Sequence, residues 1–251
     1  IDTYSVSKSG LPNAIKVFDE ILKPLGKRPT GVRIDSGDIT YLTKKCRKVL
    51  DDAGYSDCQI IVSNSLDEHI ITDVLNQGAC IDAFGVGERL ITAKSEPVFG
   101  GVYKLVAIEK DGKLIPKIKV SENTEKITNP GFKKIYRIYD KTSDKAIADL
   151  ISLNHEFINE NEPLEIFHPI ETWKRKKITN YYVKDLMVQI FEKGNQIYSS
   201  PSVLEIKEIA KNESERMWCE VQRFENPHTY IVDLSKELWT LKQNLLLNHT
   251  K

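Results

Sequence analysis

Three stretches combine polar side chains or glycine in patterns that suit an anionic, hydroxyl-rich ligand. In residues 33–38 (Arg-Ile-Asp-Ser-Gly-Asp), Arg33 and Asp35 share one strand face. Arginine can hold a phosphate by two parallel hydrogen bonds, and aspartate accepts from sugar hydroxyls. Ser63 and Asn64 offer small polar side chains, and residues 85–89 (Gly-Val-Gly-Glu-Arg) offer backbone N–H groups for a phosphate. These residue types indicate binding of a small phosphorylated molecule.

Each stretch also has a purely structural interpretation. The first could be an Arg–Asp pair followed by a helix cap at Ser36 or Asp38, and the other two could be turns. The third is not the dinucleotide fingerprint, because Leu90 stands where its last glycine belongs. The sequence leaves both interpretations open.

Histidine and cysteine give no catalytic or metal motif. The five histidines (69, 155, 168, 228 and 249) form no recognisable triad with Ser, Cys or Asp, so we expect them to be structural or exposed. The four cysteines (46, 58, 80 and 219) contain no CxxC pair, which predicts reduced thiols rather than zinc ligands or disulfides. We assign no catalytic residue and no metal ligand.

The elements that must position these stretches alternate between strand and helix in residues 1–100. We expect strands at 1–4, 31–35, 59–63 and 81–84, with helices at 11–25, 38–53 and 66–77. Such βα repetition predicts a parallel sheet, and the three stretches then lie together at the carboxyl ends of its strands. A closed barrel needs about eight strands. We therefore expect an open sheet, or a barrel completed upstream of Ile1.

Residues 101–251 change to an antiparallel pattern, which predicts a second domain with an overall α/β fold class. Two hairpins are expected, at 102–120 around Asp111-Gly112 and at 134–153 around residues 142–144. Residues 154–180 are expected to form a loop, and 202–223 and 235–248 closing helices. Trp173 and the basic run 174–177 suit either a solvated loop or contact with a nucleotide or a partner.

Composition excludes two classes of protein. Lys plus Arg and Asp plus Glu both number 36, so the chain lacks the basic excess of a general nucleic-acid binder. No apolar run approaches the about 20 residues of a membrane span. The charge is uneven, because residues 101–145 carry a net +5. This band suits a neighbouring anionic small molecule, or else is a solvated hairpin face.

The order and spacing of several motifs resemble the nicotinate phosphoribosyltransferase family, in its long bacterial form. They are Asp2-Thr3-Tyr4, 31–38, 63–68, 84–90 and 100–105, followed by 119–123, 136–140, 172–176 and 226–235. The resemblance covers nearly the whole chain. It implies a type II phosphoribosyltransferase fold, which is an irregular parallel α/β barrel with a side domain. It also implies synthesis of nicotinate mononucleotide from nicotinate and phosphoribosyl pyrophosphate, with ATP as co-substrate and Mg²⁺, in a cytoplasmic homodimer with no nucleic-acid or membrane partner.

By this resemblance, Arg33 and Asp35 face the base and ribose region, Ser63 and Asn64 line the ribose phosphate site, and Ser36 is a further substrate-binding residue. Backbone at Gly85, Gly87 and Glu88 binds the 5′-phosphate, while Asp2 borders the pocket and Lys119 contacts polyphosphate.

The chain departs from the family in one respect. The family's phosphorylated histidine precedes the Asp-Thr-Tyr motif, at which this sequence starts. We therefore expect a carboxyl-terminal portion with little activity alone. Nicotinamide or quinolinate phosphoribosyltransferase, a non-catalytic phosphate-binding module and a structural oligomerisation piece remain alternatives.

Overall fold

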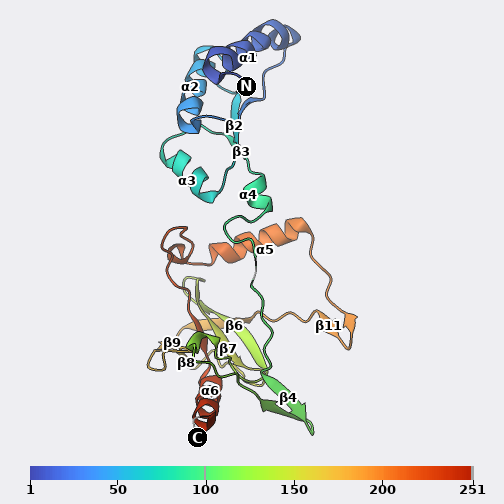
Figure 1. The fold of residues 1–251 in the computed structure, drawn as a ribbon, viewed down its shortest axis with the longest axis vertical. Helices are drawn as coiled ribbons and strands as arrows, with labels where there is room; N and C mark the ends of the chain where they lie inside the picture. The colour runs from blue at the N-terminus through green and yellow to red at the C-terminus, as the bar shows by residue number, and fades with distance from the viewer. Residues whose placement is uncertain (99, 250–251) are drawn as a thin grey trace. The chain divides into compact units, whose positions relative to one another are not determined.

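The computed structural model describes residues 1–98 and 100–249 (Figure 1). The chain divides into two compact units, Ile1–Gly101 and Val102–Lys251, here called the first and second units. Each unit has its own sheet and its own buried core. The units are therefore described separately.

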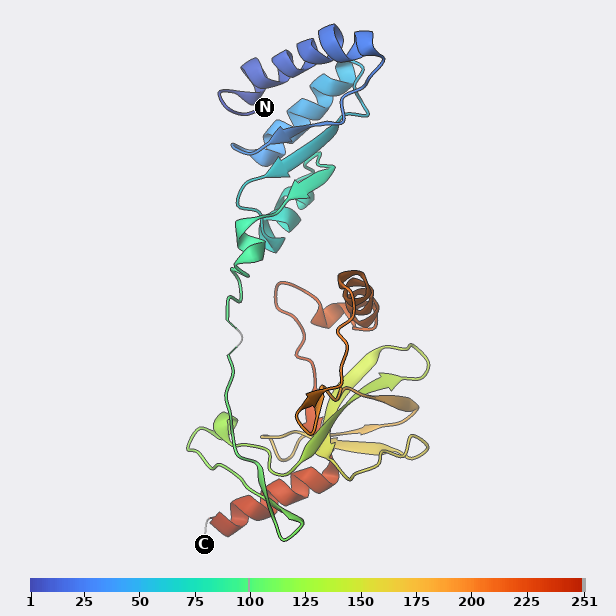
Figure 2. The same cartoon turned by 90° about the vertical axis from the view of Figure 1, so that its right-hand side faces the viewer.

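The first unit contains a parallel sheet in the order β1 (Gly31–Ile34), β2 (Gln59–Ser63) and β3 (Ala83–Gly85) (Figure 2). Helices α2 (Ile39–Asp52) and α3 (Glu68–Asn76) connect successive strands, as the βα pattern predicts. Asp38 and Asp67 cap these helices by accepting the N–H groups of Tyr41 and Ile70, each at 2.9 Å. The predicted βα units are confirmed.

The core of the first unit lies on one face of this sheet. Val32 and Ile34 in β1 and Val62 in β2 are buried with Cys46 and Leu50 of α2. Because side chains alternate along a strand, Arg33 and Ser63 project on the opposite face. The hydrophobic spacing thus decides which face carries the polar stretches.

The amino-terminal segment differs from the prediction. Residues 1–4 form no strand, although the Ile1 amino group donates to the Arg33 carbonyl at 2.8 Å, beside β1. A continuous helical stretch follows, made of η1 (Val6–Gly10), α1 (Leu11–Val17), η2 (Phe18–Leu22) and η3 (Lys23–Leu25). A short helix, α4 (Glu88–Ile91), follows β3.

The second unit is built on a six-stranded sheet in the order β10-β6-β7-β13-β8-β9. Its strands are β6 (Lys133–Asp140), β7 (Ala146–Leu153), β8 (Leu164–Phe167), β9 (Arg175–Ile178), β10 (Tyr181–Asp185) and β13 (Val232–Leu234). Only the β13–β7 pairing is parallel. The predicted hairpin around residues 142–144 is confirmed as β6–β7.

Smaller elements complete the second unit. They are the hairpins β4 (Ala107–Lys110)–β5 (Lys113–Pro116) and β11 (Phe191–Glu192)–β12 (Asn195–Gln196), the helices α5 (Val203–Glu215) and α6 (Lys236–His249), and the turns η4 (Thr124–Lys126) and η5 (Cys219–Val221). The Asp111-Gly112 turn has φ of 54° and 72°, which suits a tight hairpin and confirms that prediction.

Two predictions in this unit are wrong. Residues 154–180 contain strands β8 and β9 rather than only a loop. The sequence did not predict β9 because it is an edge strand made mostly of basic residues and lacks the alternation of apolar and polar residues. The expected helix 202–223 ends at Glu215, because Arg216 leaves the helix to contact Asp144 and the ring of Tyr139.

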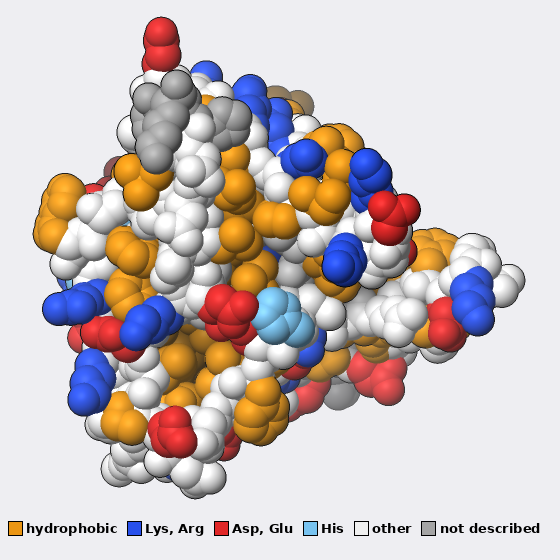
Figure 3. Space-filling view, turned by 90° about the horizontal axis from the view of Figure 1, so that it is seen from below, with side chains coloured by type: hydrophobic (Ala, Val, Ile, Leu, Met, Phe, Trp, Pro, Cys, Tyr) orange, Lys and Arg blue, Asp and Glu red, His pale blue; other side chains and the backbone are white. Residues whose placement is uncertain are grey.

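The surface mixes apolar and charged side chains. Hydrophobic side chains lie between basic and acidic ones on the face shown in Figure 3. Among the described residues, no helix combines the length and the apolar character that crossing a membrane requires.

Candidate functional site

The carboxyl ends of β1, β2 and β3 form one edge of the first unit's sheet, here called the rim. It carries the predicted site residues of this unit: Asp2, Arg33, Asp35, Ser36, Ser63, Asn64, Gly85, Gly87 and Glu88. The parallel register places Arg33 beside Ile61 and Ser63 beside Gly85, so neighbouring strands end at the same level. Ligands of parallel α/β folds bind at this end of the strands.

Arg33, Asp35 and Ser63 are joined directly. The Arg33 guanidinium contacts Asp35 Oδ1 at 2.7 Å and donates from Nε to Ser63 Oγ at 2.8 Å. Ser63 Oγ in turn donates to Asp35 Oδ1. The Arg33 side chain remains 62% exposed, so its remaining donors face solvent. This arrangement can present a fixed guanidinium and carboxylate to a ligand with phosphate and hydroxyl groups.

Asp2 and Ser36 form a second polar pair at the rim. Ser36 Oγ donates to Asp2 Oδ2 at 2.6 Å, and this hydrogen bond lowers the pKa of the Asp2 carboxyl. Gly10 lets the amino-terminal segment approach the helix, because a Cβ there would lie 1.7 Å from the Ile1 carbonyl oxygen. Asp2 thus lies beside Ser36 just after β1, and its role at the border of a binding pocket stays a prediction.

The end of β2 has an unusual backbone. Asn64 and Ser65 adopt positive φ angles of 96° and 50°. Non-glycine residues in this region cost on the order of 1–3 kcal/mol and cluster at binding sites. Gly85 lies opposite, and a Cβ there would approach the Ser63 Cβ to 3.3 Å. The close fit accounts for a glycine at this position.

The third stretch is less regular than a phosphate cradle. Gly87 precedes α4, which has only four residues, and Glu88 is an exposed residue of its first turn. Asp67 links α4 to the start of α3, because its carboxylate pairs with Arg89 and also accepts the Ile70 N–H in the first turn of α3. The hydrogen bond from Ile70 lowers the pKa of Asp67. The sequence analysis did not predict the Asp67–Arg89 ion pair. Its one signal in the sequence is an aspartate at the start of an expected helix, together with an arginine in the glycine-containing stretch 85–89.

Lys119 is a residue of the second unit and lies beyond β5, which ends at Pro116, although the sequence analysis expected the hairpin to extend to residue 120. Its backbone N–H donates to Thr128 Oγ1 at 2.9 Å. Across residues 1–98 and 100–249, no group of three His, Cys, Asp or Glu side chains is placed to hold a metal ion. Two carboxylates of the rim, Asp2 and Asp35, accept hydrogen bonds from Ser36 and Ser63.

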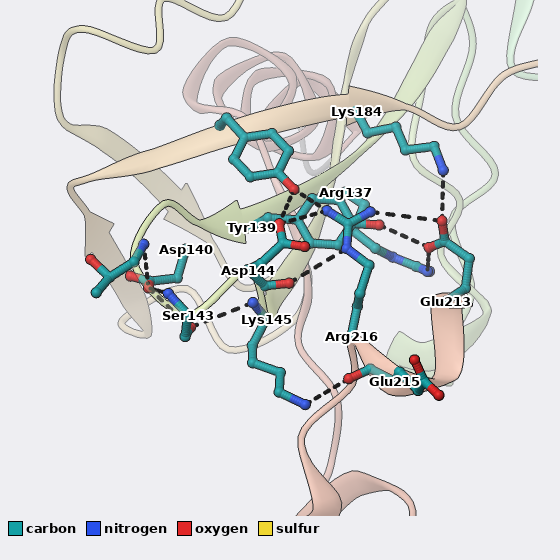
Figure 4. Close-up of polar contacts among 12 residues, drawn as sticks. Arg137, Tyr139, Asp140, Ser143, Asp144, Lys145, Lys184, Glu213, Glu215 and Arg216 are labelled. Carbon is teal, nitrogen blue, oxygen red and sulfur yellow. Dashed lines mark hydrogen bonds and ion pairs between the residues drawn. The ribbon is translucent and has the colours of Figure 1, made fainter. Parts of the chain in front are cut away.

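The second unit contains a polar network that the sequence analysis also missed (Figure 4). Arg137 donates to both carboxylate oxygens of Asp149, at 2.9 and 3.0 Å. Glu213 accepts from Tyr139 and Lys184, as Figure 4 shows. The Arg216 guanidinium lies 3.7 Å from the ring centroid of Tyr139. These contacts attach α5 to strands β6 and β10.

Comparisons with known proteins identify a family model and several relatives that match this chain. Residues 132–242 match the family model of the nicotinate phosphoribosyltransferase C-terminal domain. The chain is 46% identical over 244 residues to nicotinate phosphoribosyltransferase of Bacillus subtilis (strain 168), covering 96% of this chain and 49% of that protein. It is 38% identical over 260 residues to nicotinate phosphoribosyltransferase of Caenorhabditis elegans, covering 99% and 45%. The chain therefore spans about half the length of these relatives.

Solved structures give the same picture. A crystal structure of human nicotinic acid phosphoribosyltransferase matches with a TM-score of 0.75 and 28% identity, covering 97% of this chain and 45% of that one. Nicotinate-nucleotide pyrophosphorylase from Pyrococcus furiosus matches with a TM-score of 0.55 at 21% identity over 86% of this chain, which shows similarity of fold alone. The resemblance found in the sequence is confirmed, and so is the mixed α/β fold. The barrel remains a prediction.

Proposed function

Since this chain carries the C-terminal domain of the nicotinate phosphoribosyltransferases and is similar to them over nearly its whole length, we propose that it serves their reaction. The reaction forms nicotinate mononucleotide from nicotinate and phosphoribosyl pyrophosphate, coupled to ATP hydrolysis. The observation that carries the proposal is the rim, where Arg33, Asp35 and Ser63 from neighbouring strands form one hydrogen-bonded group.

The proposed roles follow from the chemistry of the rim. Arg33 can release Asp35 and bind an anionic group of the substrate instead. The Asp35 carboxylate can then accept hydrogen bonds from ribose hydroxyls, and the Ser63 hydroxyl can accept from them or donate to them. Asn64 and the backbone at Gly85 and Gly87 would bound the 5′-phosphate. In this proposal Lys119 would contact polyphosphate, and Asp2 and Ser36 would border the base.

The rim would bind Mg²⁺ together with the substrate, since the substrate's phosphates would supply part of the ion's ligands. Mg²⁺ in phosphate-handling sites commonly uses one or two carboxylates together with substrate phosphates and waters. Asp2 and Asp35 provide such carboxylates, whereas the described residues offer no three-ligand cage. Mg²⁺ would there neutralise charge on the pyrophosphate group.

Catalysis would then depend mainly on positioning. The nicotinate nitrogen attacks the anomeric carbon of the ribose as pyrophosphate leaves, through a transition state that resembles an oxocarbenium ion. Binding both reactants in line, and placing carboxylates such as Asp35 near the developing positive charge, lowers the barrier. We assign no general acid or base to this chain.

Three further features of the proposal rest on the family resemblance alone. They are ATP coupling through a phosphorylated histidine ahead of the Asp-Thr-Tyr motif, little activity of these 251 residues by themselves, and a cytoplasmic homodimer.

Titration calorimetry with phosphoribosyl pyrophosphate and Mg²⁺ tests the rim. We expect Arg33→Gln to weaken binding by on the order of tenfold, since it removes a charge-assisted contact. Arg28→Gln is the matched control, because Arg28 also pairs with an aspartate, Asp57, but precedes β1. Equal losses in both variants, or binding unaffected by Arg33→Gln, would contradict the assignment. Adding nicotinate, nicotinamide or quinolinate to the bound chain then distinguishes the three base specificities.

A further inference from the structure

Two cavities of the second unit meet along residues 228–231. One has a volume of about 670 Å³ and the other about 590 Å³. Both are bounded by Lys176, His228 and Tyr230, so they lie next to each other along this segment, and together they are here called the cleft. Pockets for small organic ligands typically measure about 300–1,000 Å³. The cleft therefore has the size of a ligand site, and it uses no residue of the rim.

Two motifs singled out in the sequence supply residues that line this cleft. The first is Trp173 with the basic run 174–177, which passes from the loop after β8 into β9. The second is the segment 226–235, which leads into β13. Neither motif has a role in the rim. Both motifs line the same cavity, which lies within the second unit.

A buried carboxylate lines the cleft without a partner. The Asp233 side chain belongs to a residue that is only 5% exposed, and among the described residues no hydrogen bond or ion pair reaches it. Burial raises the pKa of Asp233, whereas the positive charges of His168 and Lys176 lower it. These two groups are thus nearby but farther than ion-pair distance. The carboxylate oxygens of Asp233 are not among the fully buried polar atoms that lack a partner, and the residue lines the second cavity, so a ligand bound there can donate a hydrogen bond to them.

The cleft also offers one uncommitted cation. Lys174 pairs with Glu171, and Arg175 lies 3.7 Å from Glu165. Lys176 has no ion pair among the described residues, and it borders both cavities. An anionic group of a ligand would find this ammonium available.

Exposed indole rings flank the same cleft. Trp173 is 74% exposed on the side of the second cavity, and Trp218 is 45% exposed on the side of the first. Planar aromatic ligands stack on such rings, and base stacking on an aromatic side chain contributes measurably to nucleotide affinity. The cleft thus combines a stacking surface, a cation and an acceptor.

We propose that this cleft binds a nucleoside phosphate. The base stacks on Trp173 or Trp218, the phosphate contacts Lys176, and Asp233 accepts a hydrogen bond from a ribose hydroxyl or a base amino group. The proposal concerns a second binding site and goes beyond the function proposed for the rim.

Calorimetry of the 251-residue chain with AMP, with adenosine and with inorganic phosphate tests the proposal. We expect saturable AMP binding that quenches tryptophan fluorescence and is at least about tenfold tighter than binding of either part, since base and phosphate both contribute. Lys176→Gln should weaken AMP binding by about tenfold and leave adenosine binding unchanged. The control Lys207→Gln, on the exposed face of α5, should have no effect.

Asp233→Asn separates a ligand role from a structural one. Removing a buried, unpartnered charge should not lower the unfolding midpoint, yet it should weaken AMP and adenosine alike. The proposal would be overturned if AMP did not bind saturably, or if inorganic phosphate bound as tightly as AMP. It would also be overturned if Lys176→Gln and Lys207→Gln weakened AMP binding equally. A loss caused by Arg33→Gln but not by Lys176→Gln would overturn it as well, because the nucleotide would then bind at the rim.

Discussion

Replacing Arg137 by methionine tests the pair that this residue forms with Asp149 in the polar network of the second unit. The guanidinium makes two hydrogen bonds to Asp149, at 2.9 and 3.0 Å, and the two side chains are 18% and 13% exposed. Arg137→Met keeps most of the aliphatic length but leaves Asp149 with only the Tyr230 hydroxyl, at 2.9 Å. It also removes one positive neighbour of Glu213, the Arg137 guanidinium at 3.6 Å, while Lys184 remains paired with Glu213 at 2.7 Å.

The magnitude follows from burial. Exposed ion pairs contribute at most about 1 kcal/mol, whereas removing one partner of a buried pair costs roughly 3–5 kcal/mol. Because its two side chains are only 18% and 13% exposed, the Arg137–Asp149 pair resembles a buried pair more than an exposed one. We therefore expect Arg137→Met to lower the free energy of unfolding of the second unit by about 3 kcal/mol. The unfolding midpoint should fall by about 6–12 °C. Asp149 holds the pKa of Arg137 well above its usual range, so the charge is present at every ordinary pH and the loss should not depend on pH near neutrality.

Tryptophan fluorescence during urea unfolding is the assay, because all three tryptophans (173, 218 and 239) belong to the second unit. Arg175→Met is the matched control, since its guanidinium is 66% exposed and 3.7 Å from Glu165. We expect a loss below about 0.5 kcal/mol for this control. A double-mutant cycle with Asp149→Asn should show coupling of about 1–2 kcal/mol. Additive losses, or a loss below about 1 kcal/mol for Arg137→Met, would refute the reasoning.

Three further predictions concern other parts of the chain. Asp67→Ala should destabilise the first unit by about 1 kcal/mol or more, measured by urea unfolding followed by circular dichroism, because α3 loses its cap and Arg89 loses its partner. A thiol reagent should label exposed Cys219 quickly and Cys46 only on unfolding, because burial raises the pKa of Cys46 to about 11. The hydrogen bond from Lys184 lowers the pKa of Glu213, so its stabilisation is present above the unfolded-state pKa of about 4.3 and is lost as the pH falls through the lower folded-state pKa. Urea midpoints from pH 6 to pH 3 should therefore fall less steeply in Glu213→Gln.

Local patterns predicted the first unit well. Strand β2 has the predicted bounds, and β1 ends one residue early, because each carries its own alternation of buried and exposed residues. Strand β3 begins at Ala83 rather than 81, because the Asp82 carboxylate accepts the Ile60 N–H at 2.7 Å just before the strand. That hydrogen bond joins segments 22 residues apart, and spacing alone does not reveal it.

Long-range pairing explains most of what the sequence did not predict. Strand β13 has three residues and pairs with β7, about 80 residues earlier in the chain, so no local period marks it. The same holds for the binding residues. The shared rim was predictable from strand order, but the bonds joining Arg33, Asp35 and Ser63 depend on register. Asp233 has only one signal in the sequence, which is an acidic residue between apolar neighbours.

The basic band at residues 101–145 shows why a count of charges overstates what a ligand can use. Lys133 donates to the carbonyls of Asn129 and Gly131, and burial lowers its pKa. Arg137 is held by Asp149, and Lys145 donates to the Glu215 carbonyl at 2.6 Å. These cations satisfy the protein's own acceptors, so they contribute to folding more than to attraction of an anion. An anion bound in the cleft should therefore depend on Lys176, which lies outside the band and has no ion-pair partner among the described residues.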